Sequence, residues 1–440
     1  MLFEIKCEQS LYYYDNDSGI VYDENRMEIQ FDSMEQTAPY FIRSRQIRRE
    51  PMVRAMLDKG LISKKSRQKI DVLKIKLGSK CNYKCKYCVQ DEWRLKEYST
   101  KFDRQKFVDM MIASRIDLSK VEDVEIWGGE PFVYWKTFKP LVQAIRDDLG
   151  YNGKLITITN GSLFDDEKAQ FVIDYNVITV FSHDGPAQTI YRHETDYLDD
   201  PKIGKAIINV LQNGRASFNV VPGPYTYNLP EVYEYIKKKI NKYGEINYVP
   251  FSNEMIFRAC KDTAFILDDY DDLVAVRDKF IEFILADQTH PYWMILYKFR
   301  KSHVEMLTNF VNNRIKSSYT SFCPAQKSST LTIDVEGRNS MCHNAQYDGG
   351  IRMKGQLPNF DDFFVEGLVR AQDRKHCMVC PYIVVCNGGC PDLDNESHKI
   401  QCKSMQPYMQ AHFAAMWFRI FNDKIVSVTS CDERRKEYYY

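Results

Sequence analysis

Three closely spaced cysteines, Cys81, Cys85 and Cys88, stand in the octapeptide CNYKCKYC, directly after the β-branched run IDVLKIKLG. The C-x3-C-x2-C spacing lets three thiolates converge on one cluster while the intervening backbone aims amide groups at its sulfides. A four-iron cluster has four corners, so three protein thiolates leave one iron open for a ligand from outside the protein. For the loop taken alone, a zinc site completed by a distant residue is the alternative.

A second group of cysteines lies toward the C-terminus, with the spacing C-x13-G-x4-C, then C-x2-C-x5-C-x3-C, then a last cysteine after eleven more residues. Its members are Cys323, Cys342, Cys377, Cys380, Cys386, Cys390 and Cys402, with Gly337 between the first two. The chain has 13 cysteines, an odd number, and its start MLFEIKCEQS lacks a signal-peptide pattern. Metal or redox chemistry is therefore favoured over a disulfide framework, with a pair of structural zinc sites as the alternative.

The elements that must position these cysteines are short apolar runs that alternate with helical patterns. The runs occupy residues 71–77, 123–130, 154–162, 177–185, 217–223 and 246–252. Six candidate strands, each followed by room for a helix, predict an α/β fold with a parallel sheet, a partial (β/α)6 TIM-like barrel. Polar and glycine residues follow these runs, at the strand ends where functional groups of such folds gather.

Other segments flank this repetition. Residues 8–31 predict a hairpin around the turn sequence DNDSG, and residues 50–61 a helix. Residues 329–342 predict a second hairpin that turns at Gly337, and the tail 431–440 is expected to fray. Two helical stripes are expected to form core: Leu273, Val276, Phe280 and Ile284, and then Met409, Phe413, Met416, Trp417 and Ile420.

The composition excludes several classes of protein. The 60 basic and 60 acidic side chains give a net charge of zero, which argues against nucleic acid or an anionic membrane as a bulk partner. No apolar run approaches the ~18 residues of a membrane helix. We therefore expect no nucleic-acid or membrane partner, and a cytoplasmic location.

The sequence resembles the radical S-adenosylmethionine (SAM) superfamily, through CNYKCKYC after the first strand and WGGEPF at the end of the second. The resemblance implies that the three cysteines of the loop hold a 4Fe-4S cluster whose open iron binds the amino and carboxylate groups of SAM. It places Tyr87 beside the adenine. It also implies that Gly128, Gly129 and Glu130 receive the methionine ammonium, which suits glycine backbone and a carboxylate.

Two further strand ends resemble the family more loosely. The segment TNGS places Asn160 and Gly161 after the third strand, and FSHDGP places Ser182 and Asp184 after the fourth. By resemblance, Asn160 and Ser182 are candidate cofactor contacts, and Arg192 is a candidate partner of the cofactor carboxylate. The alternatives are a turn residue or a surface cation, and Asp184 in particular is interpreted as a possible turn residue.

The second cysteine group resembles the SPASM domain in all seven cysteines and in Gly337. That resemblance implies an auxiliary cluster one held by Cys323, Cys342 and Cys390. A second auxiliary cluster would be held by Cys377, Cys380, Cys386 and Cys402. Seven thiolates cannot close two four-iron clusters, so either Cys260 completes cluster one or that cluster keeps an open iron. Cys260 as an ordinary buried thiol is the competing interpretation.

These patterns predict four units along the chain. Residues 1–69 are an N-terminal extension with a possible role in leader-peptide binding, and 70–300 the radical SAM partial barrel. Residues 301–402 are the SPASM domain with its auxiliary clusters, and 403–440 a C-terminal helix and tail. An extension that only packs against the barrel is the alternative for residues 1–69.

The function implied by the resemblance is that of an oxidoreductase-type peptide maturase. It would generate a 5′-deoxyadenosyl radical to modify a ribosomally made peptide, forming a thioether, a carbon–carbon crosslink or a related oxidation product. The expected cofactors are SAM and three 4Fe-4S clusters, and the expected partners are a peptide substrate and an electron donor such as flavodoxin or ferredoxin. Alternatives are modification of a folded protein such as a sulfatase, or of a metabolite, and a zinc-stabilised interaction protein without catalysis. No catalytic acid or base is assigned.

Overall fold

The computed structural model of the protein describes most of the chain. The described residues are 1–16, 18–31, 44–45, 63–64, 67, 70–88, 90, 102–253, 270–311, 329–340, 342, 344, 353–365, 374–386, 388–390, 393–432 and 436–439. Cys260, Cys323 and the helix expected at 50–61 lie outside them.

The centre of the fold is a parallel sheet built from the six strands that the sequence predicts. They are β7 (Val72–Lys76), β8 (Asp123–Trp127), β9 (Lys154–Thr159), β10 (Val177–Ser182), β11 (Ala216–Val220) and β12 (Phe251–Asn253). They pair in sequence order, for example Ile75 with Ile126 and Thr159 with Phe181. The prediction of a parallel α/β fold is confirmed. Among the described residues the sheet stays open at both edges, as expected of a partial barrel.

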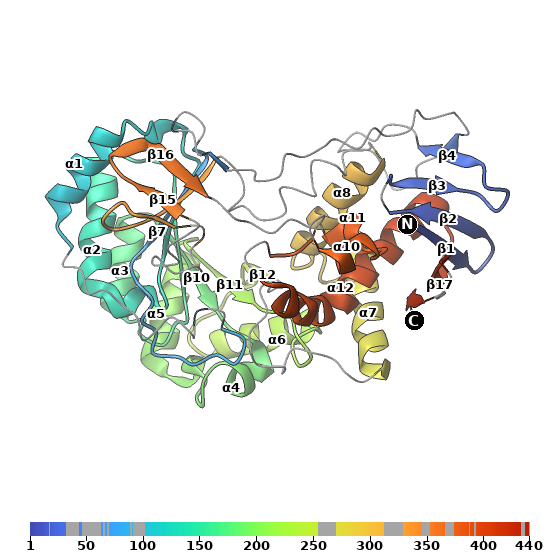
Figure 1. Ribbon diagram of the computed structural model, residues 1–440. Coiled ribbons are helices and arrows are strands. Elements are labelled where there is room, and N and C mark those ends of the chain that lie inside the picture. Colours follow the sequence, from blue (N-terminus) through green and yellow to red (C-terminus); the bar gives the residue numbers. More distant parts are fainter. Residues whose placement is uncertain are drawn as a thin grey trace.

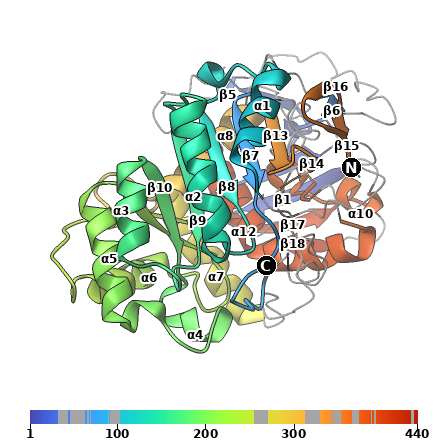
Figure 2. The same cartoon turned by 90° about the vertical axis from the view of Figure 1, so that its left-hand side faces the viewer.

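Helices connect successive strands and lie along one side of this sheet, as Figures 1 and 2 show. They are α1 (Arg104–Ser114), α2 (Trp135–Gln143), α3 (Asp166–Asp174), α4 (Gln188–Tyr191), α5 (Pro201–Gln212) and α6 (Leu229–Ile240). Aspartates cap three of them; the carboxylates of Asp103, Asp165 and Asp200 accept hydrogen bonds from backbone amides of the first turns of α1, α3 and α5. Because the six strands are parallel, their C-terminal ends all lie at the same end of the sheet. The predicted site residues follow these C-terminal ends.

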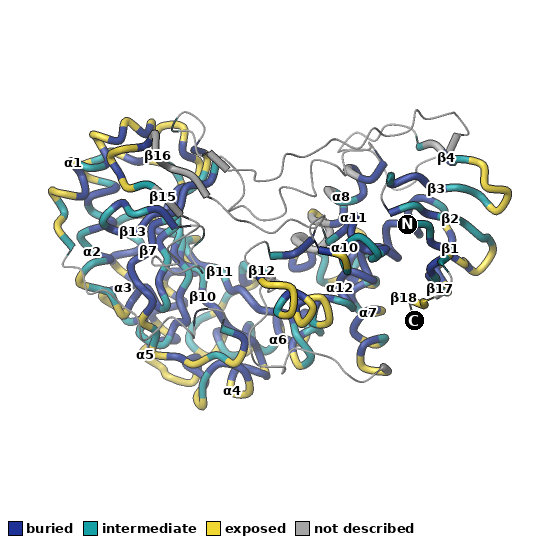
Figure 3. The backbone as a smooth tube through the Cα atoms, viewed as in Figure 1, coloured by how far each residue is buried: buried dark blue, intermediate teal, exposed yellow. Residues whose placement is uncertain are grey.

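Burial alternates along these strands as the period of two requires. In β8, Val124 and Ile126 are buried while their neighbours are half-buried. Burial of one such aliphatic side chain contributes roughly 1.5–3 kcal/mol. In Figure 3 the strands are mostly buried, and exposed residues lie on the outer turns of the helices.

A hairpin from the cysteine-rich region extends the same sheet. Strand β13 (Thr330–Asp334) pairs in parallel with β7, and β14 (Asn339–Ser340) pairs antiparallel with β13. Gly337 lies in the turn with a φ of 78°, a left-handed value that favours glycine. The predicted hairpin and its glycine turn are therefore confirmed.

A separate antiparallel sheet joins the two ends of the described chain. Its order is β18 (Glu437–Tyr439), β17 (Ile425–Ser430), β1 (Leu2–Cys7), β2 (Leu11–Asp15), β3 (Ile20–Tyr22), β4 (Glu28–Phe31) and β5 (Ser44–Arg45). The hairpin predicted around DNDSG is confirmed as β2 and β3. The expectation of a frayed tail is wrong for residues 437–439, because β18 pairs with β17 and the Tyr438 carbonyl accepts hydrogen bonds from Tyr382 and Gln410.

Three long helices support this terminal sheet: α7 (Tyr270–Leu285), α8 (Tyr297–Val311) and α12 (Asn395–Phe421). Both predicted helical stripes are buried on α7 and α12. Aromatic side chains hold the sheet on α12; Tyr12 lies 5.7 Å from Trp417, and Tyr14 lies 5.8 Å from Phe413, between ring centroids. Residues from both termini thus form one packed unit (Figure 1).

A buried histidine pair joins α8 to α12. The Nδ1 atoms of His303 and His412 lie 3.4 Å apart, and both side chains are fully buried. Burial lowers the pKa of His412 to about 3, and burial together with His412 and Arg419 lowers that of His303 well below its usual range. Tyr408 packs edge-on against His412 at 4.4 Å. Both imidazoles are therefore neutral at physiological pH.

The cysteine-rich region contributes smaller elements. These are strand β15 (Met353–Gln356), which pairs with β16 (Asn359–Val365), and helices α10 (Lys375–Met378) and α11 (Ile383–Cys386). Strand β16 also pairs with β6 (Ser63–Lys64). No helix in the described part of the chain is both long and apolar enough to span a bilayer.

Candidate active site

The three-cysteine loop leaves the sheet at the end of β7 and is held by backbone bonds to the segment that follows β8. The Gly129 amide donates to the Gly78 carbonyl at 3.0 Å, and the Glu130 amide donates to the Lys80 carbonyl at 2.8 Å. The Lys80 amide donates to the Tyr134 hydroxyl at 2.7 Å. The GGE segment therefore fixes the path of the chain directly before Cys81.

We call the place where Gly128, Gly129 and Glu130 cross the chain before Cys81 the GGE crossing. Gly129 is required there for a steric reason. A Cβ atom at position 129 would collide with the carbonyl oxygens of Ser79 and Lys80, whereas one at Gly128 would meet only ordinary contacts at 3.5 Å or more. The two glycines of the motif thus differ in role. Gly129 permits the close approach of two backbone segments, as glycine can.

Glu130 is fully buried and its carboxylate is engaged by protein donors. It accepts hydrogen bonds from the Phe132 amide (3.0 Å), the Thr159 hydroxyl (2.7 Å) and the Asn160 amide (2.7 Å). Burial raises its pKa, and the hydrogen bonds from Asn160, Phe132 and Thr159 oppose that rise. Glu130 therefore ties the ends of β8 and β9 together, and its contact with a methionine ammonium stays a prediction.

Asn160 connects the end of β9 to the cysteine loop. Its side-chain amide donates to the Asn82 side chain at 2.9 Å and lies 3.8 Å from the Cys81 sulfur. Asn82 in turn donates to the Ser162 hydroxyl at 2.7 Å. Gly161 has a φ of 81°, and a Cβ there would lie 2.7 Å from the Tyr197 ring. Asn160 thus lies beside the first cysteine, and Asn82 is a contributor that the sequence analysis missed.

The pKa of the Cys85 thiol depends on its burial and on the other two thiols of the loop. Burial raises the pKa of Cys85 to about 12; nearby Arg192 lowers it, and Cys88, Asp184 and Cys81 raise it further. The Tyr83 amide donates to the Cys81 sulfur at 3.3 Å. Three neighbouring thiols with amide donors suit an iron–sulfur cluster, which would bind them as thiolates. The residues present therefore fit the group that the sequence implies.

Tyr87, Asp184 and Arg192 meet next to this loop. The Tyr87 hydroxyl donates to Asp184 Oδ2 at 2.6 Å, and Arg192 Nε donates to the same oxygen at 2.9 Å. Asp184 is fully buried, and the other two side chains are less than a tenth exposed. Burial raises the pKa of Tyr87 well above its usual range, so its phenol keeps the proton that it donates. From the sequence alone Asp184 is interpreted as a possible turn residue, so this role was not predicted.

Arg192 and Ser182 are the two remaining residues that the sequence predicts to contact the cofactor. Within the described residues, the Arg192 guanidinium makes its one hydrogen bond through Nε, to Asp184. The Ser182 hydroxyl makes no hydrogen bond there; Tyr197 bonds the Ser182 backbone carbonyl instead. Ser182 is the last residue of β10 and is 8% exposed. Both residues can therefore offer polar atoms to a ligand at the strand ends.

Four cysteines of the second group also come together. The pKa of Cys377 is raised by burial and then by Cys386 and Cys402, and that of Cys380 by burial, Cys386 and Cys377. Burial raises the pKa of Cys386, and the backbone of Gly388 and Gly389 lowers it. These are the four cysteines that the resemblance assigns to auxiliary cluster two, and their setting fits such a cluster.

Cluster one is less complete in the described residues. Cys342 and Cys390 belong to them, whereas Cys323 and Cys260 do not. The assignment of cluster one therefore stays a prediction.

Two histidines adjoin this four-cysteine group, and neither was predicted from the sequence. His376 Nε2 lies 2.8 Å from His398 Nδ1, which lies 3.5 Å from the Cys402 sulfur. His398 precedes Cys402 by four positions on α12, a spacing that places both side chains on one helix face and could have revealed the pair.

Comparisons with known proteins agree with this geometry. Residues 74–196 match the family model of the 4Fe-4S single cluster domain, a segment that runs from β7 past Arg192. The chain is 23% identical over 176 residues to the radical SAM cyclopropyl synthase TigE of Paramaledivibacter caminithermalis; the match spans 37% of this chain and 37% of that relative.

Two solved structures are similar at the level of the chain trace. Native anSMEcpe with bound AdoMet is 17% identical, with a TM-score of 0.43 over 77% of this chain and 97% of that one. The FeFe-hydrogenase maturase HydG from Carboxydothermus hydrogenoformans is 11% identical, with a TM-score of 0.36 over 80% and 82%.

The matched segment contains the three-cysteine loop, the GGE crossing and the Tyr87–Asp184–Arg192 group, all at one edge of a parallel sheet. On these grounds residues 74–196 are similar to the 4Fe-4S single cluster domain, and 176 residues of the chain are similar to a radical S-adenosylmethionine enzyme.

Proposed function

We propose that the protein modifies a ribosomally made peptide by radical chemistry, forming a thioether, a carbon–carbon crosslink or a related oxidation product. The observation that carries the proposal is the convergence of the cysteine loop, the GGE crossing and Arg192 at one sheet edge, together with the second four-cysteine group. When bound, the cluster and SAM supply a 5′-deoxyadenosyl radical that abstracts hydrogen from the substrate.

The chain's own residues would orient the cofactor and exclude water. Cys81, Cys85 and Cys88 hold the cluster of the barrel. Arg192 presents its two terminal nitrogens to the cofactor carboxylate, and the Ser182 hydroxyl adds a further polar contact. The Tyr87 ring, packed with Cys85 against Val221, gives the adenine an apolar wall.

Cys377, Cys380, Cys386 and Cys402 would hold an auxiliary cluster that accepts an electron as the substrate is oxidised. A further cluster on Cys323, Cys342 and Cys390 brings the proposed total to three. A reduced flavodoxin or ferredoxin is the proposed electron donor.

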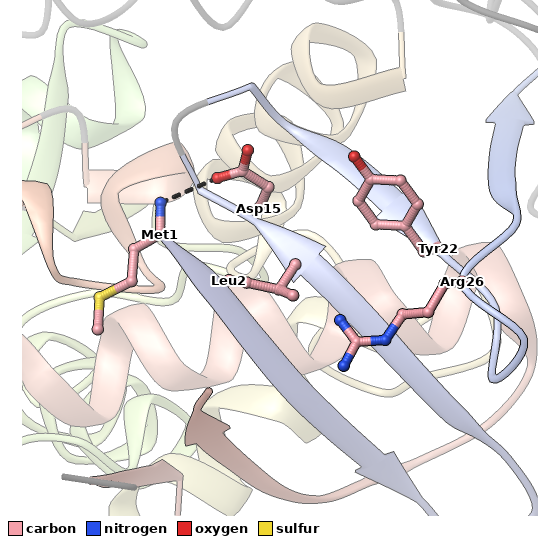
Figure 4. Close-up of a pocket in the computed structure, with 5 residues that line it drawn as sticks. All are labelled: Met1, Leu2, Asp15, Tyr22 and Arg26. Atoms are coloured by element: carbon pink, nitrogen blue, oxygen red, sulfur yellow. Dashed lines mark hydrogen bonds and ion pairs between the residues drawn. The ribbon is translucent and has the colours of Figure 1, made fainter. Parts of the chain in front are cut away.

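The terminal sheet is the proposed binding region for a leader segment of the peptide. Met1, Leu2, Asp15, Tyr22 and Arg26 line a pocket of about 440 Å³ on this sheet (Figure 4). The N-terminal amine pairs with Asp15 at 3.0 Å, and Arg26 lies 3.3 Å from the centre of the Tyr13 ring. Charged and aromatic groups beside sheet backbone suit an extended peptide.

The test is anaerobic incubation with candidate peptides, SAM and dithionite, followed by mass measurement. The proposal expects 5′-deoxyadenosine together with a peptide of changed mass. If 5′-deoxyadenosine forms and no peptide changes, the substrate is a folded protein or a metabolite. If no 5′-deoxyadenosine forms, the radical function itself is wrong.

A zinc-stabilised protein is the second candidate, because ligand atoms of His376, Cys377 and His398 lie within 4.8 Å of one another. Metal analysis of the reconstituted chain separates the two candidates. Three four-iron clusters predict about twelve irons per chain and negligible zinc.

A further inference from the structure

We propose that Asp184 is a positioning residue that sets the cofactor-facing geometry of both Tyr87 and Arg192. The inference rests on the proposed function, because it assigns the two positioned side chains to the binding of SAM. Asp184 itself touches no cofactor in this proposal and acts through its two partners.

The hydrogen bonds of Asp184 account for this role. Its Oδ2 accepts from the Tyr87 hydroxyl at 2.6 Å and from Arg192 Nε at 2.9 Å, and its Oδ1 faces the Val221 amide at 3.3 Å. Its own amide donates to the Gln188 side chain at 3.1 Å. One buried carboxylate therefore connects the cysteine loop, the segment after α4 and the end of β11.

The arrangement leaves the terminal nitrogens of Arg192 available for a ligand. Because Asp184 takes the Nε of Arg192, the guanidinium is fixed by one edge while its terminal nitrogens remain for a carboxylate ligand. The guanidinium carbon lies 5.5 Å from the centre of the Tyr87 ring. The carboxylate of Asp184 thus compensates the charge of Arg192, and a ligand can bind Arg192 without displacing Asp184.

The backbone around Asp184 is built to hold it. Gly185 has a φ of 58°, and a Cβ there would lie 2.9 Å from a Val232 methyl group. The Gly185 amide donates to His183 Nδ1 at 2.9 Å, so His183 carries its proton on Nε2 and donates to Asp196 at 2.9 Å. The buried His183 and the left-handed turn at Gly185 therefore fix the backbone on both sides of Asp184.

The test uses the full chain after anaerobic cluster reconstitution, with SAM as the probe. Binding is measured by equilibrium ultrafiltration and by the change that SAM makes to the electron paramagnetic resonance (EPR) spectrum of the reduced cluster. Asp184→Ala and Asp184→Asn are compared with Arg192→Ala and with the double variant Asp184→Ala/Arg192→Ala. Asp423→Asn is the control, since Asp423 is a buried carboxylate that accepts from the Gln9 amide beside the terminal sheet instead.

We expect Asp184→Ala to weaken SAM binding roughly 10- to 100-fold, as loss of an orienting partner does at other ligand sites. Iron content should stay at the wild-type value. The double variant should lose less affinity than the product of the two single losses, because both changes disrupt the same interaction between Asp184 and Arg192. Asp184→Asn keeps the shape of the side chain and should also bind weakly, whereas Asp423→Asn should lower the melting temperature and leave SAM binding unchanged.

Wild-type affinity in both Asp184 variants would overturn the inference, as would losses that simply multiply in the double variant. If Asp184→Ala does not fold, Asp184→Asn decides between the outcomes. Failure of the wild-type protein to bind SAM would instead overturn the proposed function, and the inference with it.

Discussion

Replacement of Gly129 by alanine should displace the cysteine loop, because the new methyl group has no room beside the carbonyls of Ser79 and Lys80. Forcing a methyl group into a closely packed site costs about 1–3 kcal/mol. The shift also weakens the backbone bonds from Gly129 to Gly78 and from Glu130 to Lys80, each contributing about 1 kcal/mol. The expected loss is therefore about 2–4 kcal/mol in the free energy of unfolding.

Gly128→Ala is the matched control, since a Cβ at that position meets nothing closer than 3.5 Å. Replacement of a glycine at a compatible backbone position stabilises a protein by about 0.4–1 kcal/mol through the unfolded state. Thermal melting of both variants, followed by iron analysis after reconstitution, measures the contrast. Gly129→Ala should melt several degrees lower and lose iron, whereas Gly128→Ala should melt at or above the wild-type temperature. Equal melting temperatures and equal iron contents in the two variants would refute the steric argument.

Two further predictions concern the clusters and the histidine pair. Cys85→Ala should abolish cleavage of SAM, whereas Cys380→Ala should retain some cleavage and lose the modified product. Both outcomes are measured by the amount of 5′-deoxyadenosine and by the mass of the peptide. Full turnover in both variants would show that the cluster assignments are wrong. His303 and His412 have pKa values below the usual 6.5, so the folded protein binds fewer protons than the unfolded chain in acid, and the stability present above pH 6.5 is lost as the pH falls. That loss should reach about 1.4 kcal/mol per pH unit for each histidine. His412→Gln should therefore make the fall in melting temperature between pH 6.5 and 5 shallower. An unchanged dependence of the melting temperature on pH would contradict the burial of neutral histidines.

Local patterns in the sequence predicted the elements that local chemistry determines. The β-branched run at 71–77 became β7, and Gly337 turned the hairpin as its place between two strands suggested. The spacing of Cys81, Cys85 and Cys88 also placed these three thiols in one loop, because a short loop keeps its own side chains near one another. These features depend on residues near one another in the chain.

Features that depend on distant residues were not predicted. Asp184 looked like a turn residue because its partners, Tyr87 and Arg192, are recognised only once the loops after β7 and β10 lie side by side. The pairing of β1 with β17 likewise joins segments from opposite ends of the chain, and no local pattern encodes that register. Tertiary packing, rather than local propensity, decides both.

The central claim is that the loop of Cys81, Cys85 and Cys88 leaves one iron of its cluster open for SAM. The most direct test is the EPR spectrum of the reduced, reconstituted Cys380→Ala variant, which reduces interference from auxiliary cluster two, recorded with and without SAM. The account predicts that SAM shifts the signal of the barrel cluster and that Cys85→Ala removes this response. An unchanged spectrum at saturating SAM, or a site filled by zinc, would contradict it.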